Sequence, residues 1–196
     1  MRVKEPDGSD VVVVRHGQTE WSLQGRHTSR TDVPLTEQGR REAARLAPAL
    51  AGREFALVLT SPRQRARETC ALAGFAAVER VDEDLREWDY GDYEGRTTAD
   101  IRVERPGWSL WSDGVPGGED VAAVGRRADR VIARLRAANG DALVFAHAHV
   151  LRVLAARWVG LAPADGMRLA LEPARPSTLG YEREVAVIRE WNAPVP

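Results

Sequence analysis

Three short apolar runs along the chain have the length and composition of buried strands. Residues 11–14 are four consecutive valines, and residues 55–59 and 142–146 are similar uninterrupted apolar runs. A run of this kind is typical of a strand that is buried on both faces of a parallel sheet. A further short strand is expected over residues 77–81. Towards the end of the chain, residues 179–188 predict a closing hairpin at a sheet edge.

Between these runs, apolar residues recur at helical spacing. Helices are expected in five segments: from Thr36 to a stop at Gly52, from Pro62 at a first helical position to Ala73, and over residues 97–104, 119–138 and 150–159. Residues 106–118 are expected to be irregular. Strands that alternate with helices indicate an α/β fold, a single three-layer domain over residues 1–196 with a mostly parallel central sheet and helices on both faces.

Polar residues follow three of the predicted strands at the point where each strand ends. Arg15 and His16 follow the first strand, residues 61–65 follow the second, and His147 follows the last of the buried strands. Because the carboxyl ends of parallel strands share one edge of the sheet, we expect these side chains to meet in one cleft. The sequence therefore predicts a binding site built from segments some 130 positions apart.

Composition narrows the classes of protein and partner. The chain has 196 residues, with 43% hydrophobic and 29% charged residues and a formal net charge of −1. These values are ordinary for a soluble globular protein, and they leave no basic excess for nucleic acid. The single cysteine, Cys70, excludes an intramolecular disulfide and fits a reducing compartment. No apolar run is long enough to cross a membrane, so a cytoplasmic location is expected. The oligomeric state stays open, with a homodimer as one alternative.

A set of ordered motifs resembles the histidine phosphatase superfamily, in the branch named after cofactor-dependent phosphoglycerate mutase. The first motif is Val-Arg-His-Gly-Gln-Thr-Glu-Trp over residues 14–21. The other matches are residues 32–36, 61–66, 85–95 and 145–147. The resemblance spans roughly residues 11–160 and implies a phosphoglycerate mutase-like fold, with a phosphohistidine intermediate on His16.

The chemistry of a phosphate ester gives these residues their predicted roles. A phosphomonoester dianion repels anionic nucleophiles, so catalysis depends on positioning and on neutralising charge. His16 is the predicted nucleophile, provided that one ring nitrogen donates a hydrogen bond and leaves the other free. Arg15 and Arg65 are expected to bind the phosphate oxygens through charge-assisted hydrogen bonds. His147 is expected to donate a further hydrogen bond, held cationic by the phosphate itself.

Glu87 is the predicted general acid, which protonates the leaving oxygen and later activates water. This role at neutral pH requires a raised pKa, which we expect from burial and from the neighbouring carboxylates of residues 89, 92 and 94. An acidic pH optimum follows as a hypothesis. No group of Cys, His, Asp or Glu has the spacing of a metal site, so no metal or other cofactor is expected.

The predicted substrate-binding set extends beyond the catalytic groups. It contains Arg15, Ser22, His27, Thr28, Arg65, Trp88, Tyr90, His147 and Ala148. Ser22 stands where many family members have Asn, and Ala148 where the pattern has Gly. For His27, contact with substrate and plain loop structure are equally compatible with the sequence. His149 and Arg152 support the site or simply begin a helix, and the tryptophans, Trp88 included, either line a substrate pocket or pack the loops.

Two departures from the mutase pattern favour hydrolysis. Trp88 stands where mutases carry an arginine for the substrate carboxylate, and the pair Arg126 and Arg127 lies inside a periodic helix instead of a long insertion. Residues 87–95 are similar to small phosphatases of the superfamily, including acid phosphatases and the sedoheptulose-bisphosphatase type. The sequence therefore predicts a phosphatase of small phosphorylated metabolites such as sugar phosphates. The alternatives are a phosphoglycerate mutase and a non-catalytic phosphate-binding module.

Overall fold

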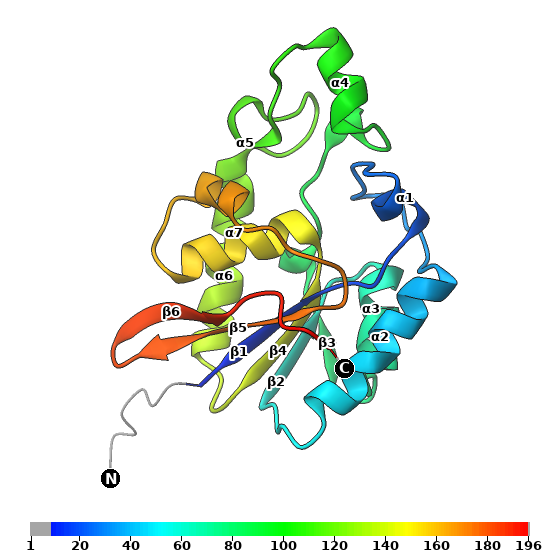
Figure 1. Ribbon diagram of the computed structural model, residues 1–196. Helices are drawn as coiled ribbons and strands as arrows, with labels where there is room; N and C mark the ends of the chain where they lie inside the picture. Colours follow the sequence, from blue (N-terminus) through cyan, green and yellow to red (C-terminus); the bar gives the residue numbers. More distant parts are fainter. Residues whose placement is uncertain (1–8, 196) are drawn as a thin grey trace.

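A computed structural model describes residues 9–195. Its centre is one six-stranded sheet (Figure 1) with the strand order β3-β2-β4-β1-β5-β6. The strands are β1 (Val11–Arg15), β2 (Leu57–Thr60), β3 (Glu79–Val81), β4 (Ala142–Ala146), β5 (Pro176–Glu182) and β6 (Val185–Glu190). β3, β2, β4 and β1 are parallel, whereas β5 is antiparallel to β1 and β6 is antiparallel to β5. The mostly parallel sheet and its closing hairpin are confirmed.

Helices cover both faces of this sheet. They are α1 (Glu20–Leu23), α2 (Glu37–Leu50), α3 (Gln64–Leu72), α4 (Thr98–Glu104), α5 (Leu110–Asp113), α6 (Val121–Arg136) and α7 (Ala148–Trp158). α2 and α3 pack together on one face, and α6 and α7 on the other (Figure 1). The valines of β1 alternate between the two apolar clusters that result, which is why all four are buried. No helix within residues 9–195 has the length and apolar character to cross a bilayer.

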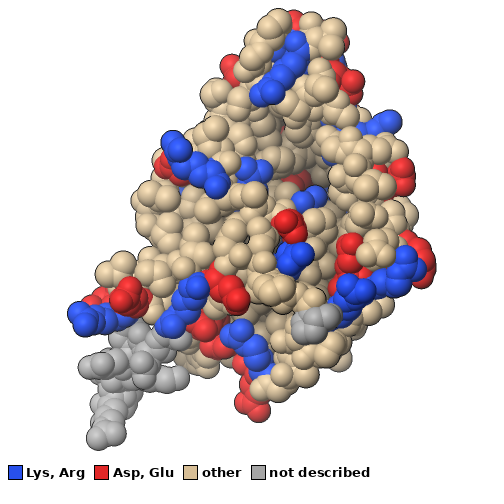
Figure 2. Space-filling view, viewed as in Figure 1, with Lys and Arg blue, Asp and Glu red and all other residues tan. Residues whose placement is uncertain are grey.

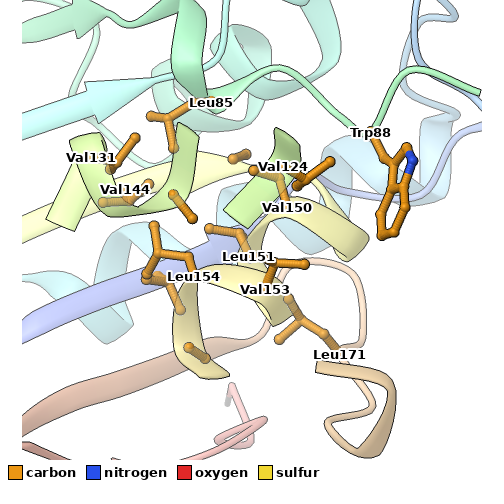
Figure 3. Close-up of a cluster of buried hydrophobic side chains, with 14 of the residues drawn as sticks. Leu85, Trp88, Val124, Val131, Val144, Val150, Leu151, Val153, Leu154 and Leu171 are labelled. Atoms are coloured by element: carbon orange, nitrogen blue, oxygen red, sulfur yellow. The ribbon is translucent and has the colours of Figure 1, made fainter. Parts of the chain in front are cut away.

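The larger core fixes the position of α7. Figure 3 shows Val131 of α6 and Leu151 and Leu154 of α7 gathered around Val144 of β4. Leu151, Leu154 and Val144 are completely buried. Fully burying an aliphatic side chain of this size stabilises a protein by about 1.5–3 kcal/mol. This packing holds the first turn of α7 at the carboxyl end of β4, beside the end of β1.

A close backbone contact fixes the loop that follows β1. A Cβ added to Gly17 would lie 2.4 Å from the carbonyl oxygen of Gly39, and one added to Gly39 would lie 2.1 Å from the oxygen of Gln18. Side chains at these positions would force the two segments apart. The start of α2 therefore supports the backbone that carries His16.

The structure corrects three local expectations. Pro62 lies outside α3, which begins at Gln64. The Asp32 carboxylate accepts the Gln64 N–H at 2.9 Å and so caps the amino end of the helix at this residue. Residues 106–118 contain the short helix α5. The helix predicted from residue 119 starts at Val121, since the Asp120 side chain accepts a hydrogen bond from Ala123 N and caps it. The short α1 was not predicted.

Candidate active site

The carboxyl ends of β1 and β4 open into a pocket of about 270 Å³. Figure 2 shows this face hollowed between the part that carries α4 and α5 and the part that carries α1. Of the predicted site residues, the pocket is lined by Arg15, His16, Ser22, His27, Thr28, Glu87, Tyr90 and Ala148. Arg65 and His147 lie next to it and are fully buried. The ring centroids of His16 and His147 are 5.1 Å apart, so the strand ends do converge.

His16 has the tautomer that a nitrogen nucleophile needs. Its Nδ1 lies 2.8 Å from the carbonyl oxygen of Gly17. A carbonyl oxygen can only accept a hydrogen bond, so Nδ1 carries the proton and the lone pair is on Nε2. Burial lowers the pKa of His16 well below its usual value, and the nearby charges of Arg65 and Arg15 lower it further. The ring is therefore neutral at physiological pH.

Both ring nitrogens of His147 are hydrogen-bonded to other side chains. The Arg65 Nε–H group donates to its Nδ1 at 3.2 Å, so its proton is on Nε2 and is donated to the Ser61 hydroxyl at 2.7 Å. Burial, together with the charge of Arg65 and the His16 ring, lowers the pKa of His147 well below its usual value. Without a ligand, His147 is therefore neutral and orients Arg65, and a cationic His147 stays a prediction for the complex with phosphate.

Both arginines are held in place by backbone carbonyls. The terminal nitrogens of Arg65 donate to Thr31 O at 3.0 Å and to Thr28 O at 3.1 Å, which leaves one N–H on each nitrogen uncommitted. Arg15 Nη1 donates to Leu171 O at 2.8 Å, while its Nε is buried and has no acceptor among residues 9–195. A buried donor without a partner is costly, and an anion in the pocket would satisfy it.

Glu87 lies at the amino end of α7 and is 5% exposed. Its Oε1 accepts the N–H groups of Trp88 and Val150, each at 2.9 Å, and its Oε2 accepts the N–H of His149 at 3.0 Å. Oε2 therefore has one backbone donor where Oε1 has two. A proton on this carboxyl group would reside on Oε2.

The electrostatic environment of Glu87 differs from the expectation. Burial raises its pKa, but the hydrogen bonds that the carboxylate accepts at the start of α7, together with the neighbouring His149, outweigh burial and lower the pKa well below its usual value. Asp89, expected to raise that pKa, is paired with Arg30 at 2.6 Å. The predicted raised pKa is therefore wrong for the protein without ligand, in which Glu87 is ionised at neutral pH.

This arrangement of two histidines, two arginines and one carboxylate agrees with a sequence match. Residues 11–194 match the model of the histidine phosphatase superfamily (branch 1). The chain belongs to the histidine phosphatase superfamily. The predicted family is confirmed.

Individual histidine phosphatases are similar to this chain over most of its length. An acid phosphatase of Mycobacterium tuberculosis is 41% identical over 95% of both chains. The sedoheptulose 1,7-bisphosphatase of Saccharomyces cerevisiae is 39% identical over 76% of this chain and 67% of its own. A solved structure of a Mycobacterium tuberculosis open reading frame superposes with a TM-score of 0.90 at 39% identity, over 96% of this chain and 99% of the other. These matches confirm the predicted fold and the enzyme class, a phosphatase.

Two hydroxyl groups of the phosphatase pocket are already engaged. The Ser22 hydroxyl donates to Thr19 O at 2.9 Å and accepts the Thr19 N–H at 2.8 Å, in the cap of α1. The Thr28 hydroxyl donates to Arg26 O at 2.9 Å. Both residues line the pocket. To donate the expected hydrogen bond to phosphate, however, the Ser22 hydroxyl would have to give up its hydrogen bond to Thr19 O.

Ala148 and Trp88 differ in how they relate to the pocket. Ala148 is the first residue of α7 and lines the pocket in ordinary right-handed conformation, so its substitution for Gly costs no backbone strain. Trp88 is completely buried, packs edge-on against Trp111, and donates from its indole nitrogen to Glu119 O at 2.8 Å. It lies outside the pocket lining, so packing accounts for Trp88.

Aromatic rings and distant segments complete the wall of the pocket. The Tyr90 hydroxyl lies 2.6 Å from His149 Nδ1, and the His27 ring packs on Tyr90 with a centroid distance of 4.7 Å. Thr98 and Leu171 also line the pocket. No sequence signal marked these last two residues, because their place depends on how α4 and the segment before β5 pack.

His27 predicts a pH dependence of stability. Burial, with the neighbouring His149, lowers its pKa to about 4 in the folded protein, from about 6.5 for an unfolded chain. Between these values the unfolded state binds more protons, so the free energy of unfolding should fall as the pH falls from 6.5 to 4. We expect His27 to contribute up to about 3 kcal/mol to this loss.

Denaturant unfolding of the wild type and of His27→Phe at pH 7.5 and pH 4.5 measures that contribution. The difference in stability between the two pH values should be smaller in the variant. An equal loss in both proteins would contradict a buried, neutral His27. Arg41→Gln, on the exposed face of α2, is the matched control and should behave as the wild type.

Proposed function

We propose that this histidine phosphatase hydrolyses small phosphomonoesters, sugar phosphates or related metabolites, through a phosphohistidine on His16. The observation that carries the proposal is the free lone pair on His16 Nε2, in a pocket that Glu87 also lines. The similarity to an acid phosphatase and to a sedoheptulose 1,7-bisphosphatase supports this substrate class. A cytoplasmic location is part of the proposal, supported by the single, buried cysteine, Cys70.

In the first step, the lone pair of His16 Nε2 forms a bond to phosphorus as the bond to the ester oxygen breaks. Arg15 Nε and the uncommitted N–H groups of Arg65 neutralise the equatorial oxygens. The N–H of Ala148, at the first position of α7, adds a donor and the positive end of the helix dipole. These groups stabilise charge without a metal ion.

Glu87 supplies the proton for the leaving oxygen. Since it is ionised in the free protein, it must acquire this proton with the substrate. A phosphate dianion nearby raises the pKa of a carboxylate, and a substrate monoanion carries the proton in. We infer that the proton sits on Oε2 and passes to the alcohol as the ester bond breaks. The ionised Glu87 then accepts a proton from water, which attacks phosphorus and releases His16 and phosphate.

Hydrolysis is favoured over phosphoryl transfer between two positions of a substrate. Arg127, one of the two arginines compared above with the mutase pair, binds Glu119 through two hydrogen bonds of 2.8 Å and is 5% exposed. It is not free to hold a substrate carboxylate. Trp88, in the place of the mutase arginine, is buried outside the pocket.

Incubation with 3-phosphoglycerate separates the proposed activity from its alternatives. We expect release of inorganic phosphate, undiminished by a chelator, because every catalytic group proposed is a protein side chain or backbone N–H. Formation of 2-phosphoglycerate without net release would show a mutase. Failure to release phosphate from this compound, from sugar phosphates and from p-nitrophenyl phosphate would favour a binding module.

A further inference from the structure

The pocket carries more positive charge than one reacting phosphate requires. Arg15, Arg26 and Arg152 line it, with Glu87 as the only carboxylate of the lining. The proposed mechanism uses Arg15, together with Arg65 beside the pocket. Arg26 is exposed at the rim and stacks on Trp21. Arg152 is half-buried, and the mechanism assigns it no role.

Arg152 is held rigidly by neutral groups. Its Nε donates to Gly166 O at 3.0 Å, one terminal nitrogen donates to Met167 O at 2.9 Å, and the guanidinium group stacks 4.7 Å from the centroid of the Trp111 ring. The other terminal nitrogen, Nη1, makes no hydrogen bond within residues 9–195, and no carboxylate of that range forms an ion pair with Arg152. A guanidinium group fixed in this way presents its free N–H groups with little loss of entropy.

Arg152 lies on the helix whose amino end faces the pocket. Ala148 begins the helix at the phosphate end, and Arg152 follows four residues later on the same helical face. Four residues of helix correspond to about 6 Å along the axis. The pocket therefore offers an inner set of donors for the reacting phosphate and, on the same face of α7, a further cation that lines the same wall.

We propose that Arg152 forms a second anion subsite, so that the preferred substrates are phosphomonoesters whose alcohol part carries a second anionic group, a carboxylate or another phosphate. The inference rests on the proposed function. A half-buried cation without a counter-ion is unfavourable, and a second anion would neutralise it. The planar fork of arginine suits both carboxylate and phosphate. A purely structural Arg152 would hold residues 166–167 and would not discriminate between substrates.

Two matched pairs of substrates test the subsite. The first pair is 3-phosphoglycerate and glycerol 3-phosphate, which differ by a carboxylate in place of a hydroxymethyl group. The second is the bisphosphate and the monophosphate of 1,3-propanediol. The wild type should favour the doubly anionic member in kcat/KM by about 10- to 100-fold, the range expected for hydrogen bonds to charged groups. Preference in one pair only identifies which anion is recognised; preference in neither overturns the proposal.

Substitution of Arg152 links the preference to this side chain. Arg152→Gln should reduce the preference to below about threefold, mainly through KM, whereas Arg152→Lys, which keeps the charge, should retain part of it. Arg157→Gln is the matched control, because Arg157 lies on the same helix, is paired with Asp129 at 2.8 Å, and should leave the preference unchanged. An equal loss on every substrate, p-nitrophenyl phosphate included, would show that Arg152 only holds residues 166–167.

A binding measurement keeps this inference separate from the proposed activity. If no substrate releases phosphate, the proposed function has failed, and calorimetric titration with the propanediol bisphosphate still measures the subsite. We then expect at least tenfold weaker binding by Arg152→Gln than by the wild type. Equal affinities would overturn the subsite.

Discussion

His16→Ala is expected to lower kcat for p-nitrophenyl phosphate by roughly 10⁴- to 10⁶-fold, the scale seen when a catalytic nucleophile is removed. The alanine methyl group cannot form a bond to phosphorus, and a water molecule in its place is not oriented as the ring is by its hydrogen bond to Gly17 O. Phosphate binding should persist, because Arg15, Arg65 and the N–H of Ala148 are unchanged. The measurement is steady-state phosphate release together with calorimetric titration of inorganic phosphate.

Trapping of the intermediate identifies the residue that carries the phosphoryl group. Rapid quenching with a ³²P-labelled substrate should give an adduct that is stable in alkali and labile in acid, as expected for phosphohistidine. It should be absent from His16→Ala and present in His149→Ala, which removes another histidine of the same pocket. The reverse pattern would contradict His16 as the nucleophile.

Glu87→Gln is expected to slow hydrolysis of alkyl phosphates such as glycerol 3-phosphate by about 10²- to 10⁴-fold, the usual contribution of general acid–base catalysis. The effect on p-nitrophenyl phosphate should be smaller, because its phenolate leaves without a proton. Glutamine keeps the size of the side chain, and its oxygen can still accept the N–H groups of Trp88 and Val150. A loss confined to poor leaving groups therefore reports on the proton and not on the fold.

The pH profile gives a second test of Glu87. As the pH rises, the protonated fraction of Glu87 in the substrate complex falls, so kcat for alkyl phosphates should decrease on the alkaline side. Glu87→Gln should remove this dependence. Asp89→Asn and Asp92→Asn change neighbouring carboxylates and serve as controls, each expected to retain the wild-type profile. If Asp89→Asn abolished the alkaline decrease while Glu87→Gln preserved it, the assignment of the acid would be wrong.

The elements of the fold could be predicted because their signals are local. The four valines of β1 and the apolar run of β4 are enough by themselves to indicate buried strands. Thr36 caps α2 locally, because its hydroxyl accepts the N–H of Gly39, three residues later. Helix boundaries that depend on a residue far away in the sequence were not predicted. The start of α3 depends on Asp32, which lies 32 residues away along the chain.

The candidate site shows the same division. The residue types of the site and their order along the chain identified the family. They also predicted that His16 and His147 meet at one edge of the sheet, because the carboxyl ends of parallel strands share that edge. The protonation state of each group could not be predicted from the sequence. The lowered pKa of Glu87 comes from hydrogen bonds at the start of α7, and the neutral state of His147 from burial against Arg65.

The sequence by itself therefore determined the kind of chemistry: a nucleophilic imidazole, two guanidinium groups and one carboxylic acid, set at strand ends that must meet. The tertiary structure decided which protons these groups carry and which extra side chains face the ligand. Arg152 entered the pocket only because its helix packs beside residues 166–167 and Trp111. The physical reason is that a chain pattern encodes burial and periodicity, whereas desolvation and hydrogen bonding depend on partners that only folding brings within reach.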